Sequence, residues 1–327
     1  MNMAEASYKL GYIFFNGLWE SFDEDFSYRF DDNIIFSRRY PDIDESNWRN
    51  WLGLKWDQVK ESNAIIEVRI PTNAPQVLDE ENKAIEDECR KLWVSLMLTG
   101  SFQVNNAYFL TGGMEEGIVN IRQFFEFATW VPSTERNKMN SPNDFVEVMT
   151  GAHIARWSDL YRQLKQVYSE NDQFWRLQRG LRYFLKACSE GDIMFRFPYF
   201  VRALEALIKP ERSTTTKQFV SRGREFWGLC KSNKNFQGDA TTVLKEIYKI
   251  RCDFDHVHGT SPEWKERQFL RCYQSEELAR AAYNEILLHQ NILEQYINDD
   301  KITMLWKNGI WGALEIRTVD SYTHNQE

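Results

Sequence analysis

The chain has 327 residues, of which 43% are hydrophobic and 27% are charged, and these proportions are typical of a soluble globular protein. A chain of this length is too long for one ordinary helical bundle, so we expect two domains. The sequence contains no run of about 18 apolar residues, which argues against a membrane-spanning helix and a membrane partner. The N-terminal stretch MNMAEASYKLGYIFF lacks the pattern of a secretory signal peptide, so we expect a cytoplasmic protein.

The net charge of −8 is unevenly distributed along the chain. Residues 1–150 hold 14 basic and 25 acidic side chains, whereas residues 151–327 hold 26 and 23. This asymmetry suggests different partners for the two halves, although ordinary surface variation explains it equally well. The five cysteines are scattered and form no CxxC pair, which favours free thiols over disulfides or a zinc site. We therefore expect neither a metal nor a cofactor.

The first 135 residues are predicted to form an α+β domain. Residues 64–71 alternate and are rich in β-branched side chains, which predicts a strand, and residues 33–36 are a shorter candidate. A helix is expected over residues 79–98, with Asp79 as its N-cap. Two more strands are expected over residues 101–110 and 118–131, joined by a turn at Thr111-Gly-Gly113.

The polar stretch 132–142 is the best candidate for a linker, because it combines Pro, Ser and Asn with few apolar residues, and we place the linker between the domains at residues 136–149. From residue 150 to about 300, helical periodicity replaces the strand patterns, which predicts an all-α domain. Residues 301–327 form a C-terminal extension. The expected helices cover residues 155–168, 172–189, 195–209, 215–229, 239–258 and 276–297.

The helix expected over residues 239–258 carries the chemistry of interest. Its apolar residues recur at spacings of four and three from Val243 to Val257, which predicts a stripe of about 80° facing the core. Arg251 lies near the edge of this stripe. His256 lies about 140° further round and about 7.5 Å along the axis, whereas His258 lies only about 20° from Arg251.

An arginine and a histidine near one helix end suit phosphodiester chemistry. The guanidinium is permanently charged and its fork of donors fits a phosphate, and an imidazole exchanges protons near neutral pH. This pairing is a weak signal by itself. The alternative is an exposed helix end at which Arg251 forms a salt bridge with Asp255 at i+4.

Two stretches resemble one known family. Residues 247–259, IYKIRCDFDHVHG, resemble the signature of HEPN domains, an Arg followed after four to six residues by a His near a helix end. Residues 195–208, FRFPYFVRALEALI, resemble a helix of the Apea-like HEPN branch. The resemblance covers about residues 150–298 and does not reach the N-terminal half.

The resemblance implies a helical bundle that forms a homodimer, with motif helices of two copies lining one cleft. Many HEPN proteins are metal-independent ribonucleases that use the RNA 2′-hydroxyl as nucleophile and leave a cyclic phosphate. By position, Arg251 would bind phosphate and His256 would act as acid or base. The spacing favours His256 as the working histidine, whereas proximity to Arg251 on a straight helix favours His258, and the choice between them stays open. His258, Asp255, Asp253 and Glu205 are further catalytic or supporting candidates. Family members commonly have Asn or Asp after the Arg, whereas this chain has Cys252.

Together these observations predict an HEPN endoribonuclease of bacterial antiphage defence or toxin-like growth arrest, with RNA as substrate. The N-terminal domain would respond to a regulatory trigger. The alternative is a non-catalytic HEPN module that binds RNA, a nucleotide or a protein, and Cys252 motivates it. Four cations recur on the helix expected over residues 172–189 and either follow an RNA backbone or form a solvated face: Arg176, Arg179, Arg182 and Lys186.

Overall fold

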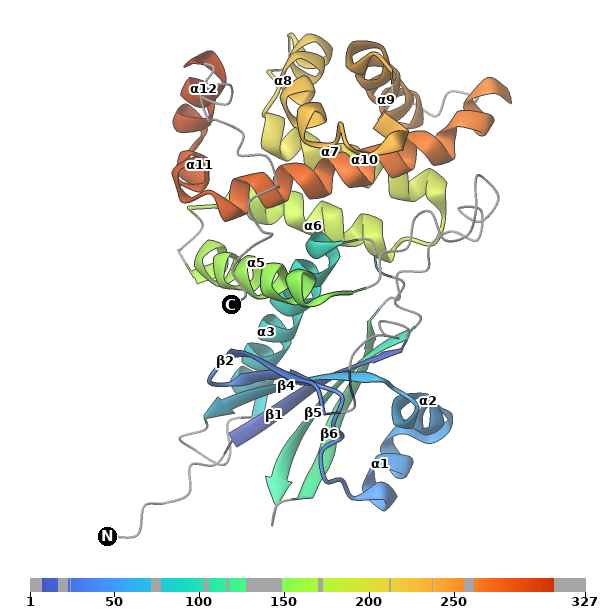
Figure 1. The fold of residues 1–327 in the computed structure, drawn as a ribbon, viewed down its shortest axis with the longest axis vertical. Helices are drawn as coiled ribbons and strands as arrows, with labels where there is room; N and C mark the ends of the chain where they lie inside the picture. The colour runs from blue at the N-terminus through green and yellow to red at the C-terminus, as the bar shows by residue number, and fades with distance from the viewer. Residues whose placement is uncertain are drawn as a thin grey trace. The chain divides into compact units, whose positions relative to one another are not determined.

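A computed structural model describes most of the chain and confirms an α+β region followed by a mostly helical region (Figure 1). Two compact units are present. The sheet unit comprises Met1–Gln166 and Phe184–Tyr199, and the helical unit comprises Val167–Tyr183 and Phe200–Glu327. The structure describes residues 8–16, 23, 25–71, 78–100, 102, 106–115, 118–127, 149–169, 173–211, 213–236, 238–255 and 262–308.

The sheet unit is built on one six-stranded antiparallel sheet with the order β2-β3-β4-β1-β5-β6. The first strand in the sequence is therefore central in space, where it pairs with β4 on one side and β5 on the other. The strands are β1 (Tyr8–Asn16), β2 (Ser27–Asp31), β3 (Ile34–Ser37), β4 (Ala64–Pro71), β5 (Asn106–Glu115) and β6 (Ile118–Phe127).

Helices cover both faces of this sheet. Because side chains alternate along a strand, Leu10, Tyr12 and Phe14 of β1 point to one face, where they join the apolar cluster with α1 (Glu45–Leu52) and α2 (Trp56–Lys60), which are linked by η1 (Gly53–Lys55).

On the opposite face, Phe15 stacks on Trp93 of α3 (Leu78–Thr99). Trp157 of α5 (Gly151–Ser169) packs there against Phe30 and Phe36 at ring distances of 5.0 and 5.3 Å. The sheet unit is thus a layer of strands between two layers of helices.

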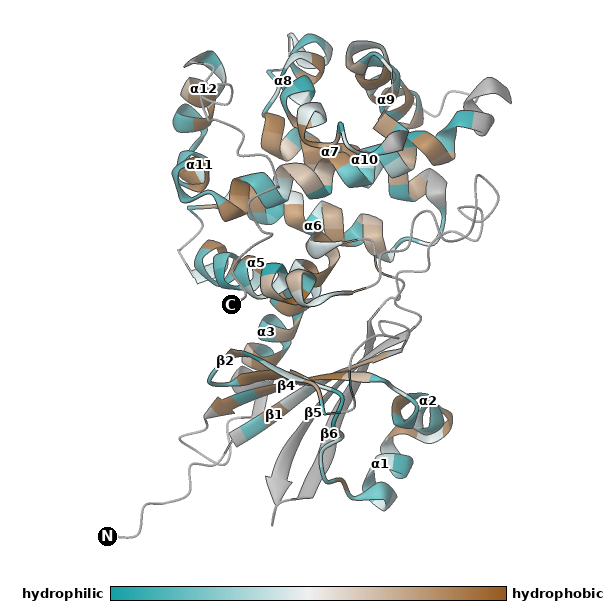
Figure 2. Cartoon of the chain, in the orientation of Figure 1, coloured by the Kyte–Doolittle hydropathy of each residue, from teal (hydrophilic) through white to brown (hydrophobic). Residues whose placement is uncertain are grey.

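The helical unit contains α8 and α9, which run side by side and pack on the long helix α10 (Figure 1). Hydrophilic and hydrophobic residues alternate along α8 and α9, as expected for amphipathic helices (Figure 2). The elements after α5 are α6 (Trp175–Ser189), α7 (Ile193–Ile208), α8 (Thr215–Leu229), η3 (Lys234–Phe236), α9 (Ala240–Asp255), α10 (Pro262–Leu288), α11 (Gln290–Leu293), η4 (Glu294–Ile297) and α12 (Asp299–Asn308).

Several predicted elements agree closely with the structure, and others are wrong. The strand 64–71 and the helix 215–229 have the predicted bounds. The turn predicted at Thr111-Gly-Gly113 is wrong, because these residues continue β5 and pair with both neighbours, with an irregularity between Thr111 and Gly112. The helix predicted from residue 276 begins at Pro262, because proline is well accommodated in the first turn of a helix.

Two further observations concern the predicted class of protein. Among the described residues, no helix is long and apolar enough to cross a membrane. All five cysteines are free thiols. The predicted linker at 136–149 lies outside the described residues except for Met149, and the extension at 301–327 is described only as far as residue 308.

Candidate functional site around Arg251

Helix α9 positions Arg251 through an ordered start and a broad buried face. The Asp239 carboxylate caps the helix by accepting hydrogen bonds from the Thr242 backbone N–H at 2.9 Å and hydroxyl at 2.7 Å. The predicted core residues Val243, Ile247 and Ile250 are buried. Two additional residues, Leu244 and Tyr248, widen the buried stripe toward the side on which Arg251 lies.

Arg251 forms an ion pair with Glu205 of α7. Its Nη2 atom donates to Glu205 Oε2 at 3.1 Å, and the two side chains are 19% and 18% exposed. Glu205 follows Leu204 and precedes Ala206, both of which are buried, so the carboxylate sits on an otherwise apolar helix. Glu205 was a supporting candidate in the sequence, and the structure brings it to Arg251. Arg251 thus has a partner on another helix, whereas the alternative i+4 pair involves the Asp255 side chain, which lies outside the described residues.

Tyr248 completes this cluster and was not identified from the sequence. Its ring lies 5.9 Å from the Arg251 guanidinium carbon, one turn earlier on α9. Burial raises the pKa of Tyr248 to about 12, and the charge of Glu205 and a hydrogen bond to it act in the same direction. The phenol is therefore protonated near neutral pH and acts as a hydrogen-bond donor. The position of Tyr248 three residues before Arg251 was the one feature of the sequence that could have identified it. A Tyr beside an apolar stripe, however, usually belongs to the core.

Other predicted site residues are described in part. Cys252 and Asp253 follow Arg251 on α9 and are half-buried. Asp255 is the last residue of α9, and its side chain is not described. His256 and His258 both lie outside the described residues.

The four cations predicted on α6 have different surroundings. Arg176 forms a two-pronged pair with Asp299 of α12, in which both N–O distances are 2.9 Å. Arg179 donates to the Tyr183 hydroxyl at 3.3 Å, and the Lys186 ammonium lies 4.6 Å from the centre of the Tyr199 ring. Arg182 is exposed. Arg176 is thus part of the internal bonding of the helical unit, whereas Arg179 and Arg182 lie on its surface.

In the cluster of Arg251, Glu205 and Tyr248, the carboxylate orients the cation and accepts the hydrogen bond of the phenol. The oriented guanidinium suits an anionic oxygen, because it offers five donors and the carboxylate engages one side of its fork. No group of three or more side chains that could hold a metal ion occurs in the described part of the chain. Comparisons with family models, with curated proteins and with solved structures find no match for this chain.

Proposed function

We propose that the chain is a metal-independent endoribonuclease of the HEPN type, in which Arg251 binds the scissile phosphate and His256 transfers protons. The observation that carries the proposal is the ion pair between Arg251 and Glu205, which holds a partly exposed guanidinium near the end of α9. The motif that brought this position to attention is the spacing of Arg251 and His256 in the sequence.

The proposed reaction requires only groups of the RNA and of the protein. The ribose 2′-oxygen attacks the adjacent phosphorus while a base, His256 in this proposal, takes the 2′-hydroxyl proton. The bond from phosphorus to the 5′-oxygen breaks, and that oxygen receives a proton. The products are a 2′,3′-cyclic phosphate and a free 5′-hydroxyl. Arg251 stabilises the negative charge that develops on the phosphoryl oxygens.

Glu205 acts as a positioning residue in this scheme. A long arginine side chain loses rotamer freedom when it binds, and a fixed carboxylate partner removes part of that cost before substrate arrives. Tyr248, which stays protonated, donates its hydroxyl to Glu205 and so helps to hold that carboxylate beside Arg251. We further propose that the helical unit dimerises, so that a second copy lines the site. The sheet unit would then respond to a trigger of antiphage defence or growth arrest in a bacterial cytoplasm.

RNA cleavage by the purified full-length protein in the presence of EDTA tests the proposal. We expect the parent to produce 5′-hydroxyl ends, and we expect Arg251→Ala and His256→Ala each to lower the rate by at least about 100-fold. Lys301→Ala is the matched control, because it removes an equal charge from an exposed position of α12. If the Arg251→Ala/His256→Ala protein cuts as fast as the parent, the proposal is wrong.

A second candidate function is a non-catalytic module that binds RNA, a nucleotide or a protein. Two observations favour it: Glu205 already neutralises the charge of Arg251, and Cys252 stands where the family usually has a polar residue. This module would bind RNA in a salt-dependent manner and release no cleavage products. Cleavage ends that depend on His256 would exclude it.

A further inference from the structure

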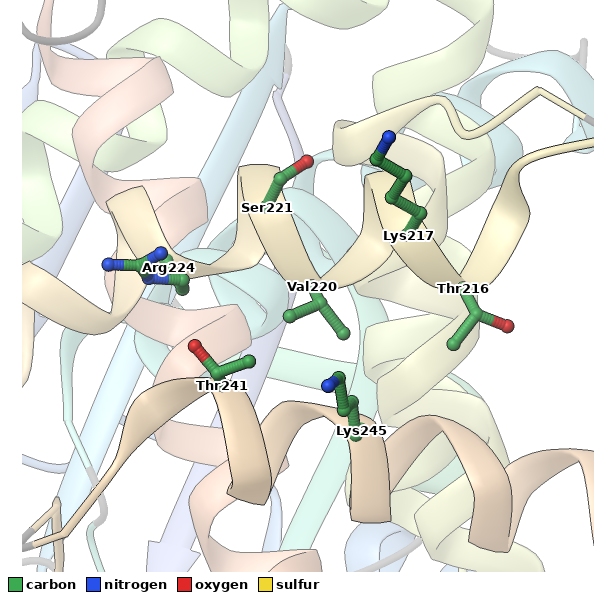
Figure 3. A pocket seen from close by; sticks show the side chains of 7 residues that line it. All are labelled: Thr216, Lys217, Val220, Ser221, Arg224, Thr241 and Lys245. Carbon is green, nitrogen blue, oxygen red and sulfur yellow. The ribbon is translucent and has the colours of Figure 1, made fainter.

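A groove between α8 and α9 is lined by three cations and three hydroxyl groups, and nothing above assigns it a role (Figure 3). The cations are Lys217, Arg224 and Lys245, and the hydroxyls belong to Thr216, Ser221 and Thr241. Its volume is about 440 Å³. None of the lining residues is acidic, so the groove has the composition expected of a site for an anion.

The two helices contribute differently to this groove. Thr241 and Lys245 of α9 point toward α8, and Val220 of α8 lies opposite them (Figure 3). Lys217 and Ser221 lie on the outer side of α8 in the same view. The groove therefore has an apolar floor at Val220, which is buried, with Lys245 directed toward α8 and Lys217 on the outer edge of the groove.

Unlike several arginines of the helical unit, the groove cations have no ion-pair partner among the described residues. Arg251, Arg271 and Arg280 all pair with carboxylates. Within the described ranges, by contrast, no carboxylate lies within ion-pair distance of Lys217, Arg224 or Lys245, and all three side chains are exposed. Their charge is therefore available to a ligand from outside the chain.

Asp239, the N-cap of α9, is an acidic residue whose charge interacts with that of Arg224. The pKa of its carboxyl lies below the ordinary value mainly because of the hydrogen bonds from Thr242, and Arg224 contributes as a smaller cause. The backbone N–H and the hydroxyl of Thr242 both donate hydrogen bonds to this carboxylate, so Asp239 caps α9. It weakens the positive field at the Arg224 end but leaves Lys217 and Lys245 unneutralised.

The spacing of the cations favours an extended anion over a single phosphate ion. Lys217 and Arg224 are seven residues apart on α8, which corresponds to about 10 Å along the helix. One phosphate group is too small to reach both ends, whereas a chain of phosphodiesters places successive charges along the groove. Arg224 offers a fork that fits phosphate oxygens, the lysines act as point charges, and the hydroxyls can donate hydrogen bonds.

We infer that the α8–α9 groove binds the phosphate backbone of single-stranded RNA. The inference takes the choice of RNA from the proposed function, but it involves none of the residues assigned to cleavage. Binding in the groove would hold a substrate strand on α9, the helix that carries Arg251. The contacts are to phosphate, so they position the strand without selecting its sequence.

Equilibrium binding of a fluorescent oligouridylate to the full-length Arg251→Ala/His256→Ala protein, measured over a series of salt concentrations, tests this inference without cleavage. Replacing Lys217, Arg224 and Lys245 by Ala in that background should make the negative slope of log K against log salt shallower by about 2, since each phosphate contact to a single strand contributes about 0.7. The affinity should fall by at least about tenfold at low salt.

The matched control replaces Lys231, Lys301 and Lys307 by Ala, which removes the same charge from exposed positions of the helical unit outside the groove. Equal losses in both triple variants, or an unchanged slope in the groove variant, would overturn the inference. So would saturation of the groove by inorganic phosphate at an affinity equal to that of the oligonucleotide. The corresponding triple Gln variant, which keeps side-chain length, replaces the Ala variant if thermal melting shows that the latter is unfolded.

The outcomes of this experiment and of the cleavage assay are separable. If the parent does not cut RNA, but the groove variant binds RNA more weakly than the protein without the groove substitutions, the proposed function is contradicted and the inference about the groove is supported. A parent that cuts through Arg251 and His256 while the groove variant binds normally contradicts the groove alone.

Discussion

The cores of the two units differ in the side chains that they bury. The interior of the sheet unit is rich in aromatic rings, such as Phe15, Phe36 and Trp157, which meet edge to face or stacked. The helical unit buries aromatic rings as well, and in addition it buries an ion pair within one helix, Glu276 with Arg280. An aromatic core derives its stability from area and shape, whereas a buried ion pair is held by the cost of separating its partners. Single substitutions should therefore lower the free energy of unfolding by different mechanisms in the two units.

The largest expected effect in the sheet unit is that of Trp157→Ala. Trp157 is fully buried and donates to the Leu92 carbonyl at 2.9 Å and to Ser95 Oγ at 3.0 Å, so its loss opens a cavity and removes two hydrogen bonds. We expect a loss of about 3 to 5 kcal/mol in the free energy of unfolding, measured by urea denaturation. The control is Trp51→Ala, at a site that is 52% exposed. Equal losses in both variants would contradict an aromatic core centred on Trp157.

In the helical unit the corresponding change is Arg280→Leu. Arg280 Nη2 pairs with Glu276 at 2.8 Å, and a second nitrogen pairs with Glu277, so the variant leaves the buried Glu276 carboxylate without its cation. We expect a loss of about 3 kcal/mol from this unpaired charge. The double variant Glu276→Leu/Arg280→Leu should recover part of it, because no charge then remains buried. If the loss in stability of the double variant equals the sum of the losses in the two single variants, the ion pair does not stabilise the helical unit in this way.

A smaller effect is expected where packing is tightest in the helical unit. A Cβ atom on Gly180 would lie 1.9 Å from the Tyr283 hydroxyl oxygen and 2.8 Å from Ala206 Cβ. Gly180→Ala should therefore destabilise by about 1 to 3 kcal/mol. Tyr283→Phe removes the nearer obstacle together with the hydrogen bond to the Ala203 carbonyl, so the double variant should be only partly rescued. Thermal unfolding of the three proteins checks this order, and strict additivity would contradict it.

The smallest predicted effect is a pH dependence at the surface. The hydrogen bond and charge of Arg176 lower the pKa of Asp299, and Lys209 adds to this. A lowered folded-state pKa contributes stability above the ordinary value of about 4, and this stability is lost as the pH falls through the folded-state pKa. Because Asp299 is 43% exposed, solvent screens the pair and the contribution is under about 1 kcal/mol. Asp299→Asn should flatten the acid limb of stability measured from pH 6 to 3, and an unchanged limb would rule out this pair as its cause.

The elements that were predictable are those whose pattern is local. Residues 64–71 are rich in β-branched side chains and alternate between apolar and charged residues from Ile66 to Ile70, and residues 215–229 carry one apolar stripe between turn residues. The central strand β1 was missed because both of its faces are buried, so its sequence does not alternate between apolar and polar residues. The start of α10 was also missed, because the helix begins at Pro262, fourteen residues before the predicted start at residue 276.

The site was predictable in its charged members but not in its contacts. Arg251 and Glu205 both stood out as charges beside apolar stripes, but only the packing of α7 on α9 pairs them across 46 residues of sequence. The groove between α8 and α9 had no motif at all. In the sequence its lysines resemble ordinary surface residues. Only the pairing of α8 with α9 makes Lys217 and Lys245 part of one groove.

The central place of β1 has a consequence for the order in which the protein folds. Tyr8 pairs with Pro71, and Asn16 pairs with Asn106, so β1 must wait during synthesis for about ninety further residues before both its edges are filled. Pairings between distant parts of a chain close slowly, because the intervening loop loses entropy before any contact compensates. During synthesis, the nascent chain therefore carries an unpaired apolar strand, YKLGYIFFN, until β5 emerges. This interval is when the growing chain is most exposed to aggregation and to chaperone binding.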